Sequence, residues 1–145
     1  MALVEKSVLI EYSAAQMYAL VENLTAYPEF LPWCGGTEIL EREGEITRAA
    51  ITIDFRGLKQ RFSTENRANP PQLIEMSLLD GPFRHLDGSW RFKALGDDAC
   101  KVEFRLHYEF SSKLLEKLVG PVFHFIANTF VDAFVKRALQ VYGKR

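Results

Sequence analysis

An alternating segment that runs directly into a long apolar helical pattern is the feature that most constrains this chain. From residue 101 to residue 110, polar and apolar side chains alternate at every position. This period of two predicts a strand with one buried side and one solvent-facing side. The apolar members of the alternation are Val102, Phe104, Leu106, Tyr108 and Phe110.

The residues that follow carry apolar side chains at the spacing of one helix face. This stripe consists of Leu115, Leu118, Val119, Val122, Phe123, Ile126, Phe130 and Phe134. Gly120 and Pro121 fall inside the pattern and predict a kink or a separate first segment. A long helix facing a one-sided sheet encloses either a filled core or a cavity, and the alternation is the same in both cases. The choice between them decides what such a chain can do.

The composition fits one globular domain over residues 1–145, long enough to bury a sizeable core. With 18 basic and 19 acidic side chains the net charge is -1, so the bulk charge gives no reason to expect binding to DNA, RNA or an anionic membrane. Residues 1–10 do not form a secretory signal, and no uncharged apolar run reaches the roughly 18 residues of a membrane span. Cys34 and Cys100 form neither a metal-type spacing nor a disulfide framework. We therefore expect a cytoplasmic protein with reduced thiols.

The rest of the chain predicts one strand, two short helices and then a series of antiparallel strands. Ser13 and Gln16 form a capping-box pattern at the start of the first helix, which ends near Asn23, and Pro28 starts the second. The strands predicted before 101–110 span residues 4–12, 37–42, 49–55, 58–66, 73–79 and 83–95. Gly88 interrupts the last of these and predicts a β-bulge.

Four short sequence motifs carry a resemblance to a known family: residues 27–34 (YPEFLPWC), 80–83 (DGPF), 88–92 (GSWRF) and 127–134 (ANTFVDAF). The chain resembles the START-like, polyketide cyclase-related superfamily, and within it the family of coenzyme Q-binding proteins and ribosome association toxins. The resemblance implies an α+β helix-grip fold, in which a curved antiparallel sheet of about seven strands wraps a long C-terminal helix, with two short helices after the first strand. Mitochondrial members have a targeting segment before the domain; none is evident here, so the chain is expected to be a bacterial member.

The resemblance implies an elongated apolar pocket between sheet and helix that binds ubiquinone or a related polyisoprenoid lipid without catalysis, in support of respiration or quinone biosynthesis. A cavity lined by rings and branched side chains can shield an isoprenoid tail from water, at about 25 cal/mol per Å² of apolar surface. The alternative is that the same side chains fill a core. The candidate lining residues are Phe30, Trp33, Phe55, Phe62, Met76, Phe83, Trp90, Phe104, Val122, Ile126 and Phe130.

Trp33 and Cys34 have two interpretations. With Gly35 and Gly36 they form either a lid over the pocket mouth or a packed plug at the end of the sheet, and the plug is favoured. We expect ligand exchange through a mouth near Trp33 and the Gly120-Pro121 kink. Cys34 is not expected to be a nucleophile, because no histidine partner lies near it in sequence and a lone cysteine usually packs as a small hydrophobe.

A set of basic residues carries a rival hypothesis. The candidate contacts are Arg56, Lys59, Arg61, Arg84 and Arg91, with Lys93 beside them. If they share one face they can meet RNA phosphates; the alternative is a solvated face balanced by Asp54, Glu65 and Glu75. The resemblance to the ribosome association toxins implies binding to the large ribosomal subunit and a block of its joining with the small one. It also leaves open a transient contact with a membrane surface, peripheral to the inner membrane.

A polyketide cyclase-like enzyme is the third alternative, and the sequence gives it little support. His85 and Asp87 share one side of a strand, but an exposed pair is favoured over an acid–base pair. His107 falls on the wet side of its strand and His124 on the polar side of the helix. No triad order, metal-ligand spacing or phosphate loop is evident. We expect no enzymatic activity, no catalytic cofactor and no metal, with ubiquinone as the bound ligand.

Overall fold

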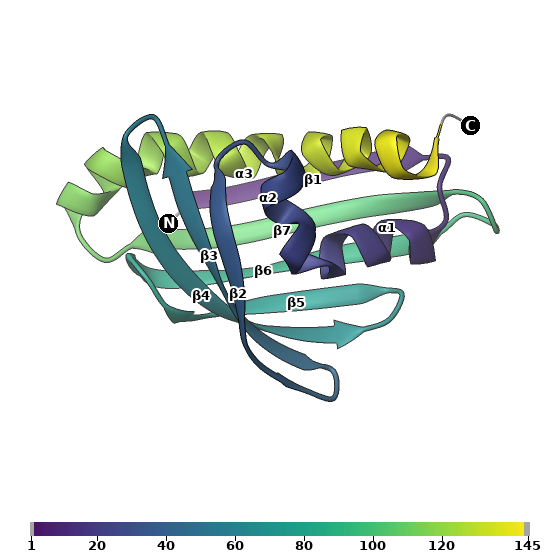
Figure 1. The fold of residues 1–145 in the computed structure, drawn as a ribbon, viewed down its shortest axis with the longest axis horizontal. Coiled ribbons are helices and arrows are strands. Elements are labelled where there is room, and N and C mark those ends of the chain that lie inside the picture. The colour runs from purple at the N-terminus through teal and green to yellow at the C-terminus, as the bar shows by residue number, and fades with distance from the viewer. Residues whose placement is uncertain (1, 144–145) are drawn as a thin grey trace.

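The structure, a computed structural model, describes residues 2–143. Its elements in chain order are β1 (Ala2–Ile10), α1 (Ala14–Glu22), the 3-10 turn η1 (Leu24–Ala26), α2 (Tyr27–Phe30), β2 (Cys34–Glu43), β3 (Ile46–Phe55), β4 (Leu58–Asn69), β5 (Leu73–Asp80), β6 (Phe83–Ala94), β7 (Cys100–Phe110) and α3 (Lys113–Tyr142). Within these residues the seven strands form one antiparallel sheet in the order β1-β7-β6-β5-β4-β3-β2. The sheet curves, and α3 runs along one side of it (Figure 1). The predicted α+β helix-grip fold is confirmed.

The predicted alternation of the last strand holds along β7. Its apolar side chains from Val102 to Phe110 are all buried, while Lys101, Glu103, Arg105 and the following alternate residues are more accessible. β1, the first strand, pairs with β7 over its whole length, so the first and last strands of the chain are neighbours in the sheet. The first strand was predicted over residues 4–12, whereas β1 begins and ends two residues earlier, at Ala2 and Ile10.

The helices of the N-terminal region begin where the sequence predicts. The Gln16 amide N–H donates to Ser13 Oγ at 3.1 Å, and the Ser13 N–H donates to Gln16 Oε1 at 2.9 Å. This capping box satisfies two of the orphan backbone donors of α1. Asn23 caps the other end of α1, and Pro28 lies in the first turn of α2.

The buried face of α3 agrees with the predicted stripe, with one correction. Its buried side chains are Val119, Phe123, Ile126, Ala127, Val131, Phe134 and Ala138. Leu118 was predicted to belong to this face but is 59% exposed. At 3.6 residues per turn, the spacings between Leu114, Leu118 and Phe125 place these three side chains on one face of the helix. This face is opposite to the one that carries Phe123 and Phe134.

Two predicted irregularities do not occur as expected. Gly88 stays in register with Met76 and Leu106, and the β6–β7 register shift lies between Phe83 and His85 instead. A glycine is needed at residue 88 because an added Cβ would lie 2.6 Å from the carbonyl oxygen of Arg105. Of the two alternatives predicted at Gly120-Pro121, a separate first segment is wrong, since α3 is continuous through Pro121, and the kink stays a prediction.

By length and composition α3 is apolar enough to cross a membrane, a test that the core helices of many globular proteins also pass. Only 33% of its most apolar stretch is buried within the fold. The helix therefore carries more apolar surface than its contact with the sheet uses.

Candidate functional site

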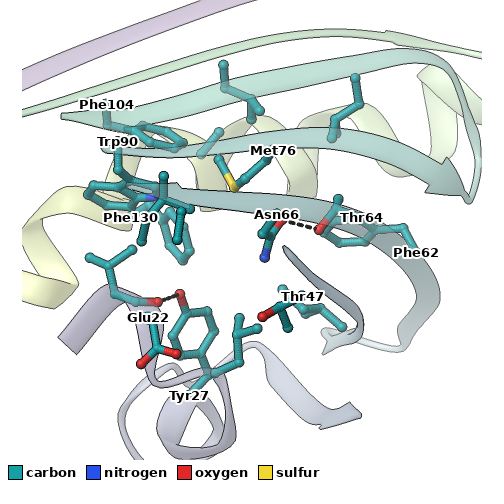
Figure 2. A pocket seen from close by; sticks show the side chains of 18 of the residues that line it. Glu22, Tyr27, Thr47, Phe62, Thr64, Asn66, Met76, Trp90, Phe104 and Phe130 are labelled. Atoms are coloured by element: carbon teal, nitrogen blue, oxygen red, sulfur yellow. Dashed lines mark hydrogen bonds between the residues drawn. The ribbon is translucent and has the colours of Figure 1, made fainter. Parts of the chain in front are cut away.

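A cavity of about 450 Å³ lies between the concave side of the sheet, the N-terminal helices and the inner face of α3. Its walls combine branched side chains with aromatic rings from distant parts of the chain (Figure 2). The centre of the fold is thus hollow, which the alternating pattern alone does not reveal. The lining residues include Tyr18, Val21, Leu24, Tyr27, Ile51, Ile53, Ile74, Leu86, Leu106, Phe123 and Ala127, none of which was among the predicted lining residues.

Of the predicted lining residues, the structure places seven on the cavity wall: Trp33, Phe62, Met76, Trp90, Phe104, Ile126 and Phe130. The other four, Phe30, Phe55, Phe83 and Val122, pack outside it. The Phe83 ring lies 4.9 Å from Phe123 and 5.0 Å from Phe110, in a closed ring cluster. Phe55 stacks on Phe125, Phe30 packs on Phe134, and Val122 is half-buried against the core. Inward periodicity does not distinguish a cavity wall from the filled core beside it.

Four aromatic rings form one end of the cavity. The Trp90 ring lies 4.6 Å from Phe104 and 5.6 Å from Phe130 (Figure 2). The Phe130 ring lies 5.8 Å from Trp33. Tilted and edge-on contacts at these distances are favourable and hold the rings in place. This wall is apolar, large and pre-formed.

A small polar group interrupts the apolar lining. Thr47 and Asn66 are register partners on β3 and β4, and Thr64 lies two residues before Asn66 on the same side of β4. The Thr64 hydroxyl, which is 6% exposed, donates to Asn66 Oδ1 at 2.8 Å. This bond turns the Asn66 Nδ2 amide toward the cavity, as Figure 2 shows. The three side chains were not predicted; the alternation that places Phe62 inward also places Thr64 and Asn66 inward, and was the available signal.

Tyr27 is a structural support of the cavity wall. Its hydroxyl donates to the carbonyl oxygen of Val21 at 2.5 Å, joining α2 to α1. Burial raises the pKa of the Tyr27 phenol far above its ordinary value, with a smaller contribution from the nearby Cys34. The phenol therefore stays neutral, and its proton is engaged with the backbone.

The exposed lining residues locate the mouth of the cavity. They lie in the β2–β3 turn, at Gly44 and Glu45 and the adjoining Arg42, and in the β4–β5 turn at Pro70. Arg42 forms an ion pair of 3.6 Å with Glu22 of α1, and both side chains line the cavity. The mouth thus opens between α1 and these two turns.

This position differs from the predicted mouth near Trp33 and Gly120-Pro121. Trp33 is 5% exposed and lies in the core cluster, so it packs as a plug rather than as a surface lid. Gly35, which would act as a hinge in the lid alternative, belongs to β2, where an added Cβ would lie 2.9 Å from the Cβ of Asp54. Pro121 lines a separate, more polar hollow of about 430 Å³ on the other side of α3, where the Tyr108 hydroxyl lies 2.8 Å from His124 Nδ1.

The predicted basic residues are exposed but are not gathered in one patch. Arg84 and Arg91 are seven positions apart on β6, so at about 3.3 Å per residue they stand roughly 23 Å apart. Arg61 is paired with Glu38 at 2.8 Å, and Arg84 lies 3.7 Å from Glu109.

The remaining members of the basic set also have neighbours. The Arg56 guanidinium lies over the Phe55 ring, Lys59 is the register partner of Asp54, and Arg91 is the register partner of Glu103. Acidic or aromatic neighbours of these basic side chains fit the alternative interpretation, a solvated face whose charges are balanced locally. Contact with RNA stays a prediction.

The candidate chemical groups outside the cavity are few. His85 and Asp87 form the contact predicted from their spacing, and both are exposed. Both thiols are buried, and burial raises the pKa of Cys34 and of Cys100, which disfavours the nucleophilic thiolate. Across residues 2–143 no three His, Cys, Asp or Glu side chains are placed to hold a metal ion.

A seven-stranded sheet that grips a C-terminal helix around an apolar cavity defines a START-like, helix-grip protein. Residues 10–135 match the model of the family described as polyketide cyclase / dehydrase and lipid transport. The chain belongs to this family, and within it to the group that includes ribosome association toxins and coenzyme Q-binding proteins.

Two relatives and one solved structure show what this chain is similar to. The chain is 44% identical to the ribosome association toxin RatA of Pseudomonas aeruginosa, over 97% of each chain. It is 30% identical to the coenzyme Q-binding protein COQ10 homolog B, mitochondrial, of Xenopus laevis, over 97% of this chain and 59% of that protein. The crystal structure of the Zhui aromatase/cyclase from Streptomyces sp. R1128 superposes with a TM-score of 0.83 at 16% identity, over 94% of this chain and 93% of that one. At 16% identity this last likeness shows the fold alone.

Proposed function

We propose that this protein binds ubiquinone or a related polyisoprenoid lipid in the cavity between the sheet and α3. The observation that carries the proposal is the hollow centre: about 450 Å³, enclosed largely by apolar side chains. Small-molecule sites typically measure roughly 300–1,000 Å³ and are apolar with a few polar groups that orient the ligand. Transfer of an isoprenoid tail from water into such walls contributes about 25 cal/mol per Å² of buried apolar surface.

The polar group in the lining suits a ligand with a carbonyl at one end. The Asn66 amide donates hydrogen bonds, and the Thr47 hydroxyl lies on the neighbouring strand at the paired position. Both can donate to a quinone oxygen, while the ring wall around Trp90 receives the apolar part. The name of the Xenopus relative, a coenzyme Q-binding protein, supports the same ligand class.

In this proposal the lipid is cargo, and no catalytic cofactor takes part. The protein would sequester or deliver quinone in support of respiration or quinone biosynthesis, from the cytoplasm and in transient contact with the inner membrane. Ligand would enter past the Glu22–Arg42 ion pair at the mouth. Because both side chains are about half exposed, this pair is weak, on the order of 0–1 kcal/mol, and its opening is easy.

Native mass spectrometry on protein purified from a ubiquinone-producing bacterium, followed by lipid extraction, tests this proposal. A quinone bound at one per chain supports it, and a protein that is empty and takes up no added quinone overturns it. Ile126→Trp replaces a branched side chain with a bulky ring that fills part of the cavity from α3, and should lower quinone occupancy while unfolding stays cooperative. Leu139→Trp, at a 51% exposed position on the same helix, is the matched control. Unchanged binding in Ile126→Trp would exclude the cavity as the site.

A second function is favoured by the relatives of highest identity reported above. The 44% identity to a ribosome association toxin over 97% of both chains supports a proposal that this protein binds the large ribosomal subunit and blocks subunit joining. Among the basic residues, Arg56, Lys59 and Arg61 lie closest together, around the β3–β4 turn, and are the best candidates for a phosphate contact.

Sedimentation of the protein with purified large subunits at increasing salt tests this second function. Reversal of Arg56, Lys59 and Arg61 to Glu should abolish binding and its salt dependence, since each phosphate contact releases counterions. The control is Lys136→Glu, an exposed cation on α3 far along the chain from this turn. Unchanged binding in the triple variant would remove this turn as the ribosome contact, and quinone occupancy of the same variant would show its cavity is intact.

A further inference from the structure

The side of α3 that faces away from the sheet is apolar over its N-terminal half. Leu114 is 66% exposed, Leu118 is 59% exposed and Phe125 is 50% exposed. Their spacings of four and seven residues place them on one side of the helix, with the exposed Pro121 between them. We call these four residues the outer stripe. In Figure 1 α3 lies along one edge of the molecule, with the sheet on its other side.

The outer stripe extends onto the sheet. The Phe125 ring stacks on Phe55 at the end of β3, with centroids 5.9 Å apart and planes within 5° of parallel. Leu58, the register partner of Phe55, is half-buried beside it. The apolar surface therefore spans two elements rather than one turn of helix. A contiguous exposed apolar patch of this kind usually marks an interaction surface.

Cations border the outer stripe on both sides. Lys113 and Lys117 are exposed on α3, on the helix flank that also carries His124. Arg56 lies at the β3–β4 turn with its guanidinium 4.8 Å from the Phe55 centroid. Glu116 lies on a different face of the helix from Leu114 and Leu118, and with Pro121 it lines the second hollow described above. Asp132 ends the apolar run at its C-terminal side. The charges that flank the stripe at Lys113, Lys117 and Arg56 are thus basic, although the whole chain has a net charge of -1.

We propose that the outer stripe docks this protein on an anionic lipid bilayer. An apolar helix face with Lys and Arg at its edges is the pattern of a helix that lies in the membrane interface, where the apolar side chains enter the acyl boundary and the cations meet lipid headgroups. A second copy is a poorer occupant, because a two-fold contact through this face brings Lys113, Lys117 and Arg56 of both copies into one interface. A bilayer that contains phosphatidylglycerol neutralises all three.

Docking through the outer stripe is independent of what the cavity holds. The stripe lies on the outer side of α3, whereas Phe123, Ile126 and Phe130 line the cavity from the inner side. The mouth, at the β2–β3 and β4–β5 turns, belongs to other elements. A substitution in the stripe should therefore change membrane binding and leave the cavity unchanged.

Vesicle flotation of the full chain tests the proposal, with vesicles of phosphatidylcholine alone and of phosphatidylcholine mixed with phosphatidylglycerol. The wild-type protein should float with the anionic vesicles, and less so as salt is raised. The double variant Leu114→Glu, Leu118→Glu should bind at least about tenfold more weakly, because it removes apolar insertion and adds two like charges. The control is Leu9→Glu, at a 70% exposed leucine on β1.

Three results would overturn the docking proposal. The first is that wild-type protein fails to float with anionic vesicles, and the second is that Leu9→Glu loses binding as much as the double variant does. The third is a dimer in analytical ultracentrifugation that dissociates in the double variant while vesicle binding is absent, which would assign the stripe to a second copy. Quinone occupancy of the double variant, measured by native mass spectrometry, separates failure of docking from failure of the cavity proposal.

Discussion

Truncation of two phenylalanines one turn apart on α3 tests whether the cavity is hollow in solution. Phe134 is 1% exposed, and its ring has neighbours at 5.2 Å from Phe30, 5.3 Å from Trp90 and 5.4 Å from Tyr27. It is therefore packed on all sides. Phe130 lies on the same buried face, yet it is only half-buried and lines the cavity, so part of its ring faces empty space. Side chains next to a void have already lost contacts on that side.

The expected magnitudes follow from this difference. Phe134→Ala removes a fully packed ring and should cost about 3–5 kcal/mol. At about 4 °C per kcal/mol for a chain of this size, the midpoint of thermal unfolding should fall by roughly 12–20 °C. Phe130→Ala should cost at least about 1 kcal/mol less, since the transfer and cavity contributions are both smaller for a ring that already borders a void. Helix propensity cancels between the two, because both positions are inside α3.

Urea denaturation and calorimetry of the ligand-free protein measure both costs. Equal losses of stability in the two variants, within about 0.5 kcal/mol, would refute the reasoning, because they would mean that Phe130 is as fully packed as Phe134. The centre of the ligand-free fold would then be filled, and the cavity proposal would lose the observation that carries it. Added quinone should raise the midpoint of wild-type protein and of Phe134→Ala alike, because only the folded state binds.

Three further predictions concern single positions. Gly88→Val should lower stability by more than about 2 kcal/mol in urea denaturation, because the new Cβ would lie 2.6 Å from the Arg105 carbonyl oxygen; a loss below about 0.5 kcal/mol would contradict that close approach. Tyr27→Phe should cost about 1–3 kcal/mol by leaving the Val21 carbonyl without its donor, and a neutral result would mean that water replaces the hydroxyl. Both cysteine thiols should react with a thiol reagent far more slowly at pH 8 in the native protein than in denaturant, since burial raises their pKa and lowers the thiolate fraction; fast native labelling would show that they are accessible.

The fold could be predicted because its signals are local. Alternation along β7, the Ser13–Gln16 capping box and the helical spacing around Phe123 each depend on a few neighbouring residues. Such signals identify elements and their buried sides. They do not distinguish a glycine that forms a β-bulge from a glycine that is needed because another chain segment lies close to it. At Gly88 the reason is a close neighbour, the carbonyl oxygen of Arg105 on β7.

The site was only partly predictable, because it depends on how distant elements meet. Trp90 and Phe130 were identified from inward periodicity, and the same reasoning included Phe83, which the structure places outside the cavity, in the ring cluster with Phe123. The polar pair Thr47 and Asn66 exists only through the register of β3 with β4. The mouth was misplaced because it is defined by the approach of two turns to α1, and no segment of sequence records that approach.

A final prediction concerns the two faces of α3, one of which lines the proposed quinone cavity while the other carries the proposed membrane-docking stripe. Ile126 lines the cavity from the inner face, and Leu118 is exposed on the outer face about two helical turns earlier, so the two side chains do not contact each other. Non-contacting sites add in free energy within about 0.3–0.5 kcal/mol. The combined variant Ile126→Trp, Leu118→Glu should therefore lose quinone occupancy and vesicle binding each by the amount seen in the single variants. A non-additive loss in either assay would mean that occupancy of the cavity moves α3, and membrane docking would then be coupled to the bound lipid rather than independent of it.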